Sequence, residues 1–194
     1  PSAGVLVATI RALKFHGGVA REDLTQENLP ALRAGLANLN RHINNLRENY
    51  GVPAVVSINQ FVADTDAEVE LVMEHCKALG VKVALSSHWA NGGAGATDLA
   101  HMVAEICDAD PMPANQPHDS FVYSAELSLW EKLEAVATKV YHASEITANT
   151  KVRERIKELT DGGYGHLPVC IAKTPYSFST DPALKGAPTD HVMD

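Results

Sequence analysis

The feature that most constrains this chain is an alternation of short apolar, β-branched runs with longer stretches of helical periodicity. The runs cover residues 4–10, 53–58 and 81–86. Such continuous apolar runs are typical of strands covered on both faces of a parallel sheet. Between the first two runs, apolar residues recur every three or four positions, at Leu29, Leu32, Leu36, Leu39, Ile43 and Leu46. Strand–helix alternation of this kind predicts βαβ units. We therefore predict an α/β fold with a mostly parallel sheet and helices on both of its faces.

Local signals predict where the helices begin and end. Thr25 is the expected N-cap of the first helix, and Gly51 is its expected left-handed C-cap. Thr65 and Glu68 have the spacing of a capping box, which predicts the start of the second helix. Residues 11–18, which close on two glycines, are predicted to form a loop.

The chain divides into three predicted segments. A helix over about 97–107 completes a sheet core at 1–110, with the order β-α-β-α-β-α. Three prolines then mark the start of a loop and small helical insertion at 111–162. Two helices are expected in the insertion, over 127–142 and 150–160. Residues 163–194 are predicted to hold a return strand, at 166–172, and a polar loop. Because the chain starts at a proline and runs almost at once into a strand, we interpret it as a piece of a longer protein.

Composition excludes several classes of protein. The 194 residues carry a net charge of −8 and no basic run, which argues against nucleic-acid binding. The longest apolar runs are too short to cross a bilayer, so no membrane association is expected. The three cysteines, Cys76, Cys107 and Cys170, form no CxxC pair and are interpreted as packing residues. Their pattern predicts a reducing, cytoplasmic location.

Two aromatic residues suggest a binding site. Phe61 and Trp89 each follow a predicted strand, and the carboxyl ends of parallel strands meet at one edge, where such folds bind ligands. Two rings at one edge can hold a flat ring between them, or they can simply cap the core. The residues alone leave both interpretations open. His16 and His88 are predicted to wall the same edge. The nine histidines show no metal-ligand spacing, and no metal site is predicted.

The glycine-rich stretch 91–95 precedes a predicted helix and can present backbone amides to an anion. It contains neither GxxxxGK[ST] nor GxGxxG, so close packing of helix on strand is an equal explanation. Residues 59–64 faintly resemble the base-recognition loop of nucleotide hydrolases, with Gln60 in place of its lysine.

Taken together, several segments resemble formate–tetrahydrofolate ligase. They are Val7–Lys14 with His16–Gly18, Glu27–Leu29 with Gly35–Leu39, Pro53–Asp64 with Asp66–Glu68, His88–Ala90 with Gly92-Gly93, Trp130–Lys132, Gly163–Ser179 and Gly186–Pro188. The resemblance implies a sheet like that of P-loop nucleotide hydrolases. It also implies a reaction in which formate, ATP and tetrahydrofolate give 10-formyltetrahydrofolate through formyl phosphate. In that family a Phe and a Trp sandwich the pterin ring, and they fall on Phe61 and Trp89, with Leu85 as a wall.

The resemblance has further implications. The family's phosphate-binding loop, with its lysine and a nearby arginine, lies upstream of the matching region, so no catalytic residue is assigned and the chain alone is expected to be inactive. Five residues are expected near the nucleotide: Lys173, Tyr176, Ser177, Gly186 and Pro188. ATP is expected with Mg²⁺, a monovalent cation is allowed for, and the full-length protein is expected to be a homotetramer. The alternatives are a nucleotide-hydrolase relative that acts as a switch or partner-binding module, and a non-catalytic scaffold whose aromatic rim binds a protein.

Overall fold

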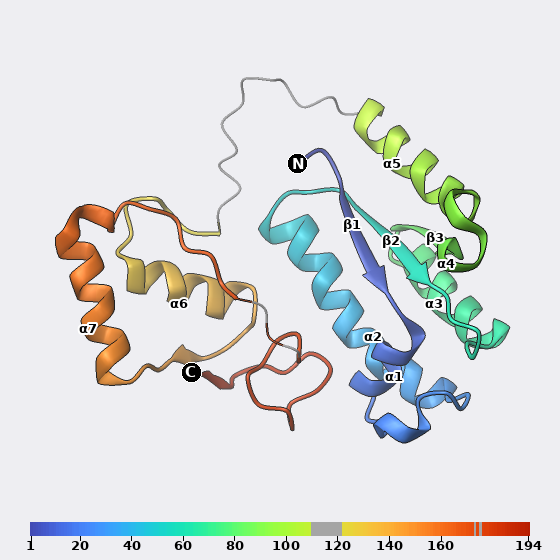
Figure 1. Ribbon diagram of the computed structural model, residues 1–194, viewed down its shortest axis with the longest axis horizontal. Helices are drawn as coiled ribbons and strands as arrows, with labels where there is room; N and C mark the ends of the chain where they lie inside the picture. The colour runs from blue at the N-terminus through green and yellow to red at the C-terminus, as the bar shows by residue number, and fades with distance from the viewer. Residues whose placement is uncertain (110–121, 173, 175) are drawn as a thin grey trace. The chain divides into compact units, whose positions relative to one another are not determined.

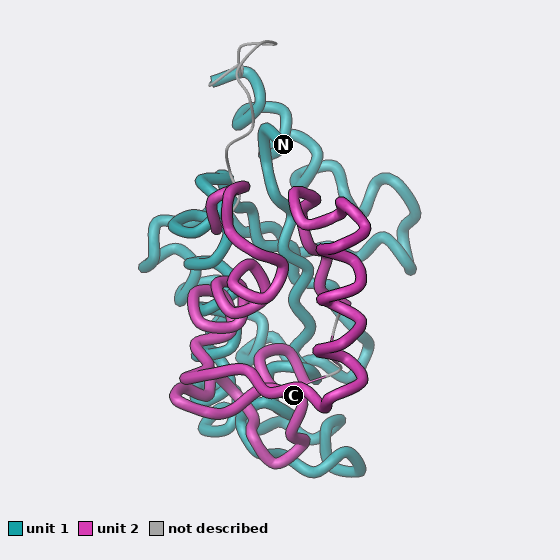
Figure 2. The backbone as a smooth tube through the Cα atoms, turned by 90° about the vertical axis from the view of Figure 1, so that its left-hand side faces the viewer, with its two compact units in different colours: residues 1–118 teal, residues 119–194 magenta. Residues whose placement is uncertain are grey.

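The computed structural model describes residues 1–109, 122–172, 174 and 176–194. The chain forms two compact units, unit 1 at 1–118 and unit 2 at 119–194 (Figure 2). No helix in the described ranges is long and apolar enough to span a bilayer.

Unit 1 is built on a parallel sheet of three strands in the order β1-β2-β3 (Figure 1). The strands are β1 (Gly4–Ala8), β2 (Ala54–Asn59) and β3 (Lys82–Ser86). Ile58 lies opposite both Ala8 and Leu85. The three strands therefore end at the same edge, which confirms the predicted parallel arrangement.

Helices cover the sheet. They are α1 (Ile10–His16), α2 (Leu29–Asn44), α3 (Asp66–Ala78), the short α4 (His88–Asn91) and α5 (Thr97–Ala109). Val56 and Val83 point into a core that they share with apolar side chains of α2 and α3. Val55 and Ala84 point to the opposite face and are also buried. Because α5 packs against β2 and β3, it covers that second face.

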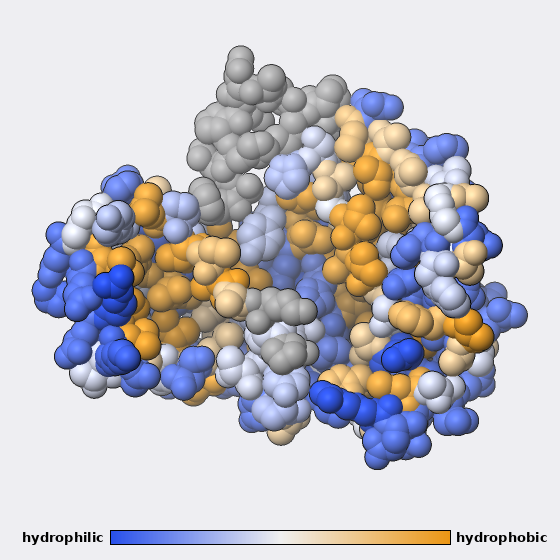
Figure 3. All heavy atoms as spheres, in the orientation of Figure 1, coloured by the Kyte–Doolittle hydropathy of each residue, from blue (hydrophilic) through white to orange (hydrophobic). Residues whose placement is uncertain are grey.

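The edge strand β1 departs from the predicted burial on both faces. Val5 is 44% exposed and Val7 is 60% exposed. Both lie on the same face as their register partners Val55 and Ser57. Helix α5 covers this face over β2 and β3, and the described residues leave β1 open. Figure 3 shows apolar residues gathered at the surface over this part of unit 1.

Two of the predicted boundaries in unit 1 are wrong. Residues 11–18 are not a loop, because α1 begins directly after β1, where Thr9 Oγ1 accepts a hydrogen bond from Ala12 N at 3.1 Å. The N-cap of α2 is Asn28, not Thr25; its Oδ1 accepts from Ala31 N at 3.0 Å. In each case a polar side chain directly before the first helical turn accepts a hydrogen bond from a free backbone amide of that turn.

Other predicted signals are confirmed. Thr65 and Glu68 form the capping box of α3. Gly51 has φ +62°, in the left-handed region, after a π-helical turn at 45–49 that extends α2.

Unit 2 contains α6 (Leu129–Lys139) and α7 (Thr150–Leu159), which confirm the two helices predicted in the insertion. A two-stranded parallel sheet joins β4 (Glu145–Ile146) to β5 (Val192–Met193). Both helices have side-chain N-caps, Ser128 for α6 and Asn149 for α7.

The return strand predicted at 166–172 is not present. The segment has no strand partner among the described residues, and side chains hold it instead. Tyr123 Oη accepts from Val169 N at 2.9 Å. The buried ammonium of Lys132 donates to Gly165 O at 2.9 Å and to Leu167 O at 3.1 Å. An apolar β-branched run forms a strand only where another backbone is available to pair with it. Cys170 in this segment is exposed, so it is not a packing residue as predicted.

Candidate functional site

The Phe61 turn lies directly beyond β2. Gln60 N donates to Ser86 O at 3.1 Å, which carries the pairing with β3 one residue past the strand. Phe61 N then donates to Asp64 Oδ2 at 2.8 Å, and Asp64 N donates back to Phe61 O at 3.0 Å. These two bonds close the turn. They place the partly buried Phe61 ring at the carboxyl edge of the sheet.

Trp89 lies directly beyond β3, in α4. Trp89 is 61% exposed. Ser87 N donates to Gly95 O at 3.0 Å, so the chain leaves the strand and folds back tightly around α4. Leu85, near the end of β3, is 37% exposed and lies opposite Ile58.

The sheet thus brings the three predicted folate-site residues to one edge: Phe61 just after β2, Leu85 near the end of β3 and Trp89 just after β3. Beneath them Ser57 Oγ and Ser86 Oγ share a buried hydrogen bond of 2.8 Å, which ties β2 to β3 close to their ends. Phe61, Leu85 and Trp89 each keep part of their apolar surface accessible at this edge. Such an edge can bind a flat apolar ligand.

Arg11 also belongs to this edge, although no local pattern selects it. Its guanidinium carbon lies 5.0 Å from the centroid of the Phe61 ring. Arg11 is the second residue of α1, which follows β1 and therefore starts at the same edge. A loop at 11–18, as predicted, would not have fixed the position of Arg11 at this edge. The available signal was Thr9, which has the right position to cap a helix.

A buried ion pair lies behind the Phe61 turn. Lys14 Nζ lies 2.8 Å from Glu68 Oε1, and both side chains are fully buried. Lys14 also donates to Gln26 O at 2.8 Å, while Glu68 accepts from Asn28 N at 3.0 Å and from Thr65 N at 3.2 Å. Burial raises the pKa of Glu68, but the bonds from Lys14, Asn28 and Thr65 outweigh it, so the net pKa falls below 4.5.

The pKa of Asp64 shifts in the opposite direction from that of Glu68. Burial raises the pKa of its carboxyl group above 3.8, with the nearby Glu68 adding to the rise, against the lowering effects of the Phe61 amide, Lys14 and Arg11. Its Oδ2 accepts the Phe61 bond, whereas its Oδ1 is buried without a hydrogen-bond partner in the described residues. The structure thus keeps one carboxylate oxygen out of water in order to close this turn.

The glycine-rich stretch has a structural explanation. A Cβ at Gly95 would come within 3.0 Å of the backbone of Ser87 and His88. Gly92 has φ +58° with ψ −145°, a conformation that only glycine adopts readily. Close packing therefore accounts for Gly95, and the backbone conformation accounts for Gly92. His88 is exposed beside Trp89, whereas His16 lies at the far end of α1, about two turns beyond the end of β1.

No metal centre is formed within the ranges that the structure describes. They contain no group of three or more His, Cys, Asp or Glu side chains that could hold a metal ion.

The residues predicted near the nucleotide belong to unit 2, except that Lys173 lies outside the described residues. They are Tyr176, Ser177, Gly186 and Pro188. Their loop folds around Phe178, which is 2% exposed and meets the ring of Tyr141 edge-on at a centroid distance of 6.3 Å. Ser177 and Gly186 both have positive φ, +64° and +73°. The loop is thus a defined structure with an aromatic anchor.

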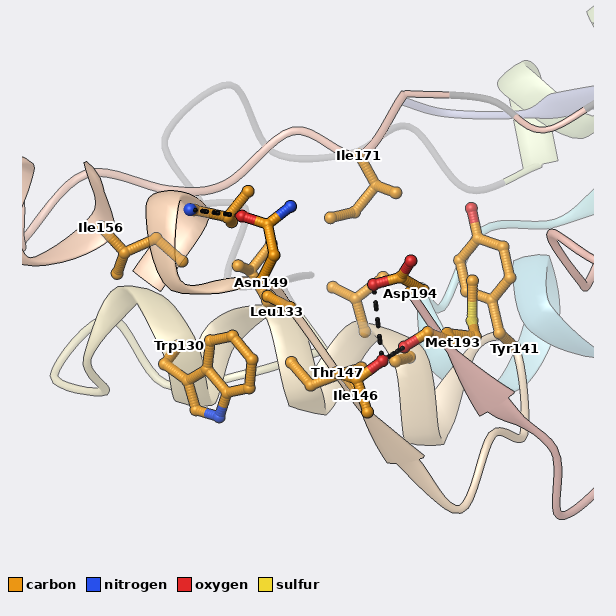
Figure 4. Close-up of a pocket in the computed structure, with 14 residues that line it drawn as sticks. Trp130, Leu133, Tyr141, Ile146, Thr147, Asn149, Ile156, Ile171, Met193 and Asp194 are labelled. Carbon is orange, nitrogen blue, oxygen red and sulfur yellow. Dashed lines mark hydrogen bonds between the residues drawn. The ribbon is translucent and has the colours of Figure 1, made fainter. Parts of the chain in front are cut away.

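Unit 2 also contains an apolar cavity of about 220 Å³ between α6, α7 and the short sheet (Figure 4). Its polar side chains are engaged within the unit: Asn149 Oδ1 accepts from Val152 N, and Thr147 Oγ1 lies 3.5 Å from Asp194 Oδ1. None of the described candidate residues lines it.

Comparison with known proteins decides the family. The formate–tetrahydrofolate ligase family model matches residues 1–194. The chain belongs to the formate–tetrahydrofolate ligase family. It is 56% identical over 193 residues to the formate–tetrahydrofolate ligase of Methylococcus capsulatus, and 50% and 52% identical to those of Pelagibacter ubique and Granulibacter bethesdensis.

All of the chain is covered in each of these matches, but only 34%, 33% and 33% of the relatives' own lengths. The chain therefore spans about a third of the formate–tetrahydrofolate ligases that it matches. Membership of this family confirms the resemblance.

Proposed function

We propose that this chain is the pterin-binding part of an ATP-dependent ligase that joins formate to tetrahydrofolate, giving 10-formyltetrahydrofolate through formyl phosphate. Family membership supports the reaction. One structural observation supports the role of this part. Phe61 and Trp89 follow adjacent parallel strands at one edge of the sheet, and Trp89 is 61% exposed there.

The chemistry of the substrate suits this edge. A pterin is a flat, polarisable ring, and each aromatic partner adds about 0.5–1.5 kcal/mol beyond the area that it buries. A ring held between Phe61 and Trp89 requires about 7 Å between their planes, roughly twice a stacking separation. Leu85 adds apolar surface between the two turns. Held in this way, the folate amine would be oriented for attack on the formyl group, and orientation lowers the barrier by removing rotational freedom.

The residues present do not fit the phosphates of ATP. The 194 residues contain no GxxxxGK[ST] motif, and the described ranges hold no cluster for a metal. We therefore assign no step of phosphoryl transfer to this chain, and propose that the isolated chain is inactive. Tyr176, Ser177, Gly186 and Pro188 remain proposed neighbours of the nucleotide, together with Lys173. The sheet type of P-loop hydrolases, bound Mg²⁺ and a monovalent cation, a cytoplasmic location and a homotetramer are proposed from the family alone.

Steady-state kinetics tests the pterin site in a full-length ligase that includes these 194 residues, referred to below as the full-length ligase. Phe61→Ala and Trp89→Ala should each raise the KM for tetrahydrofolate about tenfold, because each removes one stacking partner, about 1.4 kcal/mol. The KM values for ATP and formate should not change. Val62→Ala is the control, since Val62 is apolar, adjacent to Phe61 and 88% exposed. An unchanged KM for tetrahydrofolate in both aromatic variants would contradict the proposal.

A further inference from the structure

Two side chains from different parts of unit 1 hold Phe61. Arg11 lies over the ring, with its guanidinium carbon 5.0 Å from the centroid. Asp64 binds the backbone, with Oδ2 accepting from Phe61 N at 2.8 Å. One contact orients the ring and the other fixes the turn that carries it.

The backbone of Arg11 is held in place by its neighbours. Arg11 lies in the first turn of α1, next to the buried Ile10 and after the Thr9 cap. A guanidinium at this distance covers one face of the ring and is attracted to its π-electrons. Arg11 thereby restricts rotation of the Phe61 ring.

Asp64 is specialised for the same turn. Its Oδ1 is buried without a partner in the described residues, so this carboxylate gives up part of its solvation. In return, Asp64 Oδ2 accepts a hydrogen bond from Phe61 N. Asp64 N donates to Phe61 O, and this second bond completes the turn. The positive charges of Lys14 and Arg11 both lower the pKa of the Asp64 carboxyl group, against the larger effect of burial.

We propose that Arg11 and Asp64 are positioning residues for tetrahydrofolate, which act by holding Phe61 in the orientation that stacks on the pterin. This inference rests on the proposed function of Phe61. Neither residue needs to contact the substrate.

The test uses steady-state kinetics of the full-length ligase. Arg11→Met keeps the length of the side chain but loses the cation, and should raise the KM for tetrahydrofolate about threefold. Asp64→Ala should raise it about five- to tenfold, because the turn loses its closing bond. Asp64→Asn should restore a KM near the wild-type value, since an amide oxygen accepts the same bond. The kcat and the KM values for ATP and formate should stay unchanged in all three variants.

Two comparisons separate positioning from other roles. Arg21 lies over Phe15 at 5.6 Å in the same kind of contact, so Arg21→Met is the matched control and should leave the KM for tetrahydrofolate unchanged. In a Phe61→Ala background, Arg11→Met should have no further effect, because residues that act through one group are not additive. A further rise in KM in that background would show that Arg11 binds the substrate directly and would overturn the inference.

The remaining outcomes are also decisive. If Phe61→Ala raises the KM for tetrahydrofolate but Arg11→Met and Asp64→Ala do not, the positioning role is wrong and the pterin site stands. If Arg11→Met lowers that KM, Arg11 blocks the ring instead of orienting it, and the inference is again wrong. If Phe61→Ala itself has no effect, the proposed function fails first.

Discussion

At the scale of single residues, two glycines determine how closely α1 and α2 approach. A Cβ at Gly35 would overlap the carbonyl oxygen of Leu13, and a Cβ at Gly17 would overlap that of Ala31. Both obstacles are backbone atoms, which cannot rotate away. The close crossing therefore depends on the absence of a side chain at each position.

Gly35→Ala should lower the free energy of unfolding of unit 1 by about 2–3 kcal/mol, because the helices must separate. Helix propensity alone would predict a gain of about 1 kcal/mol, so the sign distinguishes the two effects. Urea denaturation measures the change. Gly93→Ala is the control, since a Cβ there meets nothing within 4 Å. A Gly35→Ala variant as stable as the wild type would contradict the close crossing.

A histidine on α2 predicts how stability depends on pH. Burial, followed by the charges of His16 and Arg41, lowers the pKa of His42 from 6.5 to about 4. Below pH 6.5 the unfolded chain takes up a proton that the folded chain refuses until about pH 4. Unit 1 should therefore lose stability as the pH falls through this window.

Urea denaturation at a series of pH values between 6.5 and 4 measures this loss. His42→Gln should make the dependence shallower, because this titrating group is gone, while His75, whose pKa burial also lowers, keeps part of it. His101→Gln should not, since His101 is exposed on α5. Equal slopes for the wild type and His42→Gln would show that another group is responsible. Protonation of Glu68, whose pKa is also lowered, removes stability as the pH falls below 4.5, so it adds to the loss only at the lower end of this window.

At the scale of elements, the buried pair of Lys14 and Glu68 joins α1 to α3 and to the segment before α2. Removal of one partner leaves a buried charge unpaired, which costs about 3–5 kcal/mol. Lys14→Met should therefore destabilise unit 1 by that amount in urea denaturation. The double variant Lys14→Met/Glu68→Gln should recover part of the lost stability, because the neutral amide of the glutamine leaves no unpaired charge in the core.

The control for this pair is Lys82→Met. Lys82 and Glu105 form an exposed ion pair, with side chains 44% and 67% accessible, and such pairs contribute less than about 1 kcal/mol. If Lys14→Met costs no more than Lys82→Met, the buried pair does not join the elements as described.

Much of this element structure could be predicted from periodicity and capping signals. The strands β2 and β3, the helices α2, α3, α5, α6 and α7, and the Thr65–Glu68 capping box all have local signals in the sequence. Helix α1 was missed because Lys14, a charged residue, is one of its buried positions. Its partner Glu68 lies far along the chain, so no local pattern reveals it.

The other incorrect predictions also depend on tertiary context. Val5 and Val7 have the sequence of a strand covered on both faces, yet nothing described covers one face of β1. Residues 166–172 have the sequence of a strand but find no strand to pair with among the described residues. In the site, Phe61 and Trp89 could be selected because aromatic residues after strands are a local pattern. Arg11 and Asp64 could not, because their roles depend on what the fold places beside Phe61.

At the scale of the whole chain, the candidate residues divide between the units. Phe61, Leu85 and Trp89 lie in unit 1, while the loop with Tyr176 and Gly186 lies in unit 2. Neither set includes a motif for binding phosphates. The 194-residue chain should therefore release no ADP when given ATP, formate and tetrahydrofolate, whereas the full-length ligase should release it. Formate-dependent ADP release by the chain alone would contradict the assignment.

The central claim, a pterin held between Phe61 and Trp89, is tested most directly by fluorescence. The chain has two tryptophans, so Trp130→Phe leaves Trp89 as its single indole. In that background a tetrahydrofolate analogue should quench Trp89 in a saturable titration, and Phe61→Ala should raise the Kd about tenfold. An absence of quenching, or the same Kd with and without the Phe61 ring, would contradict the claim.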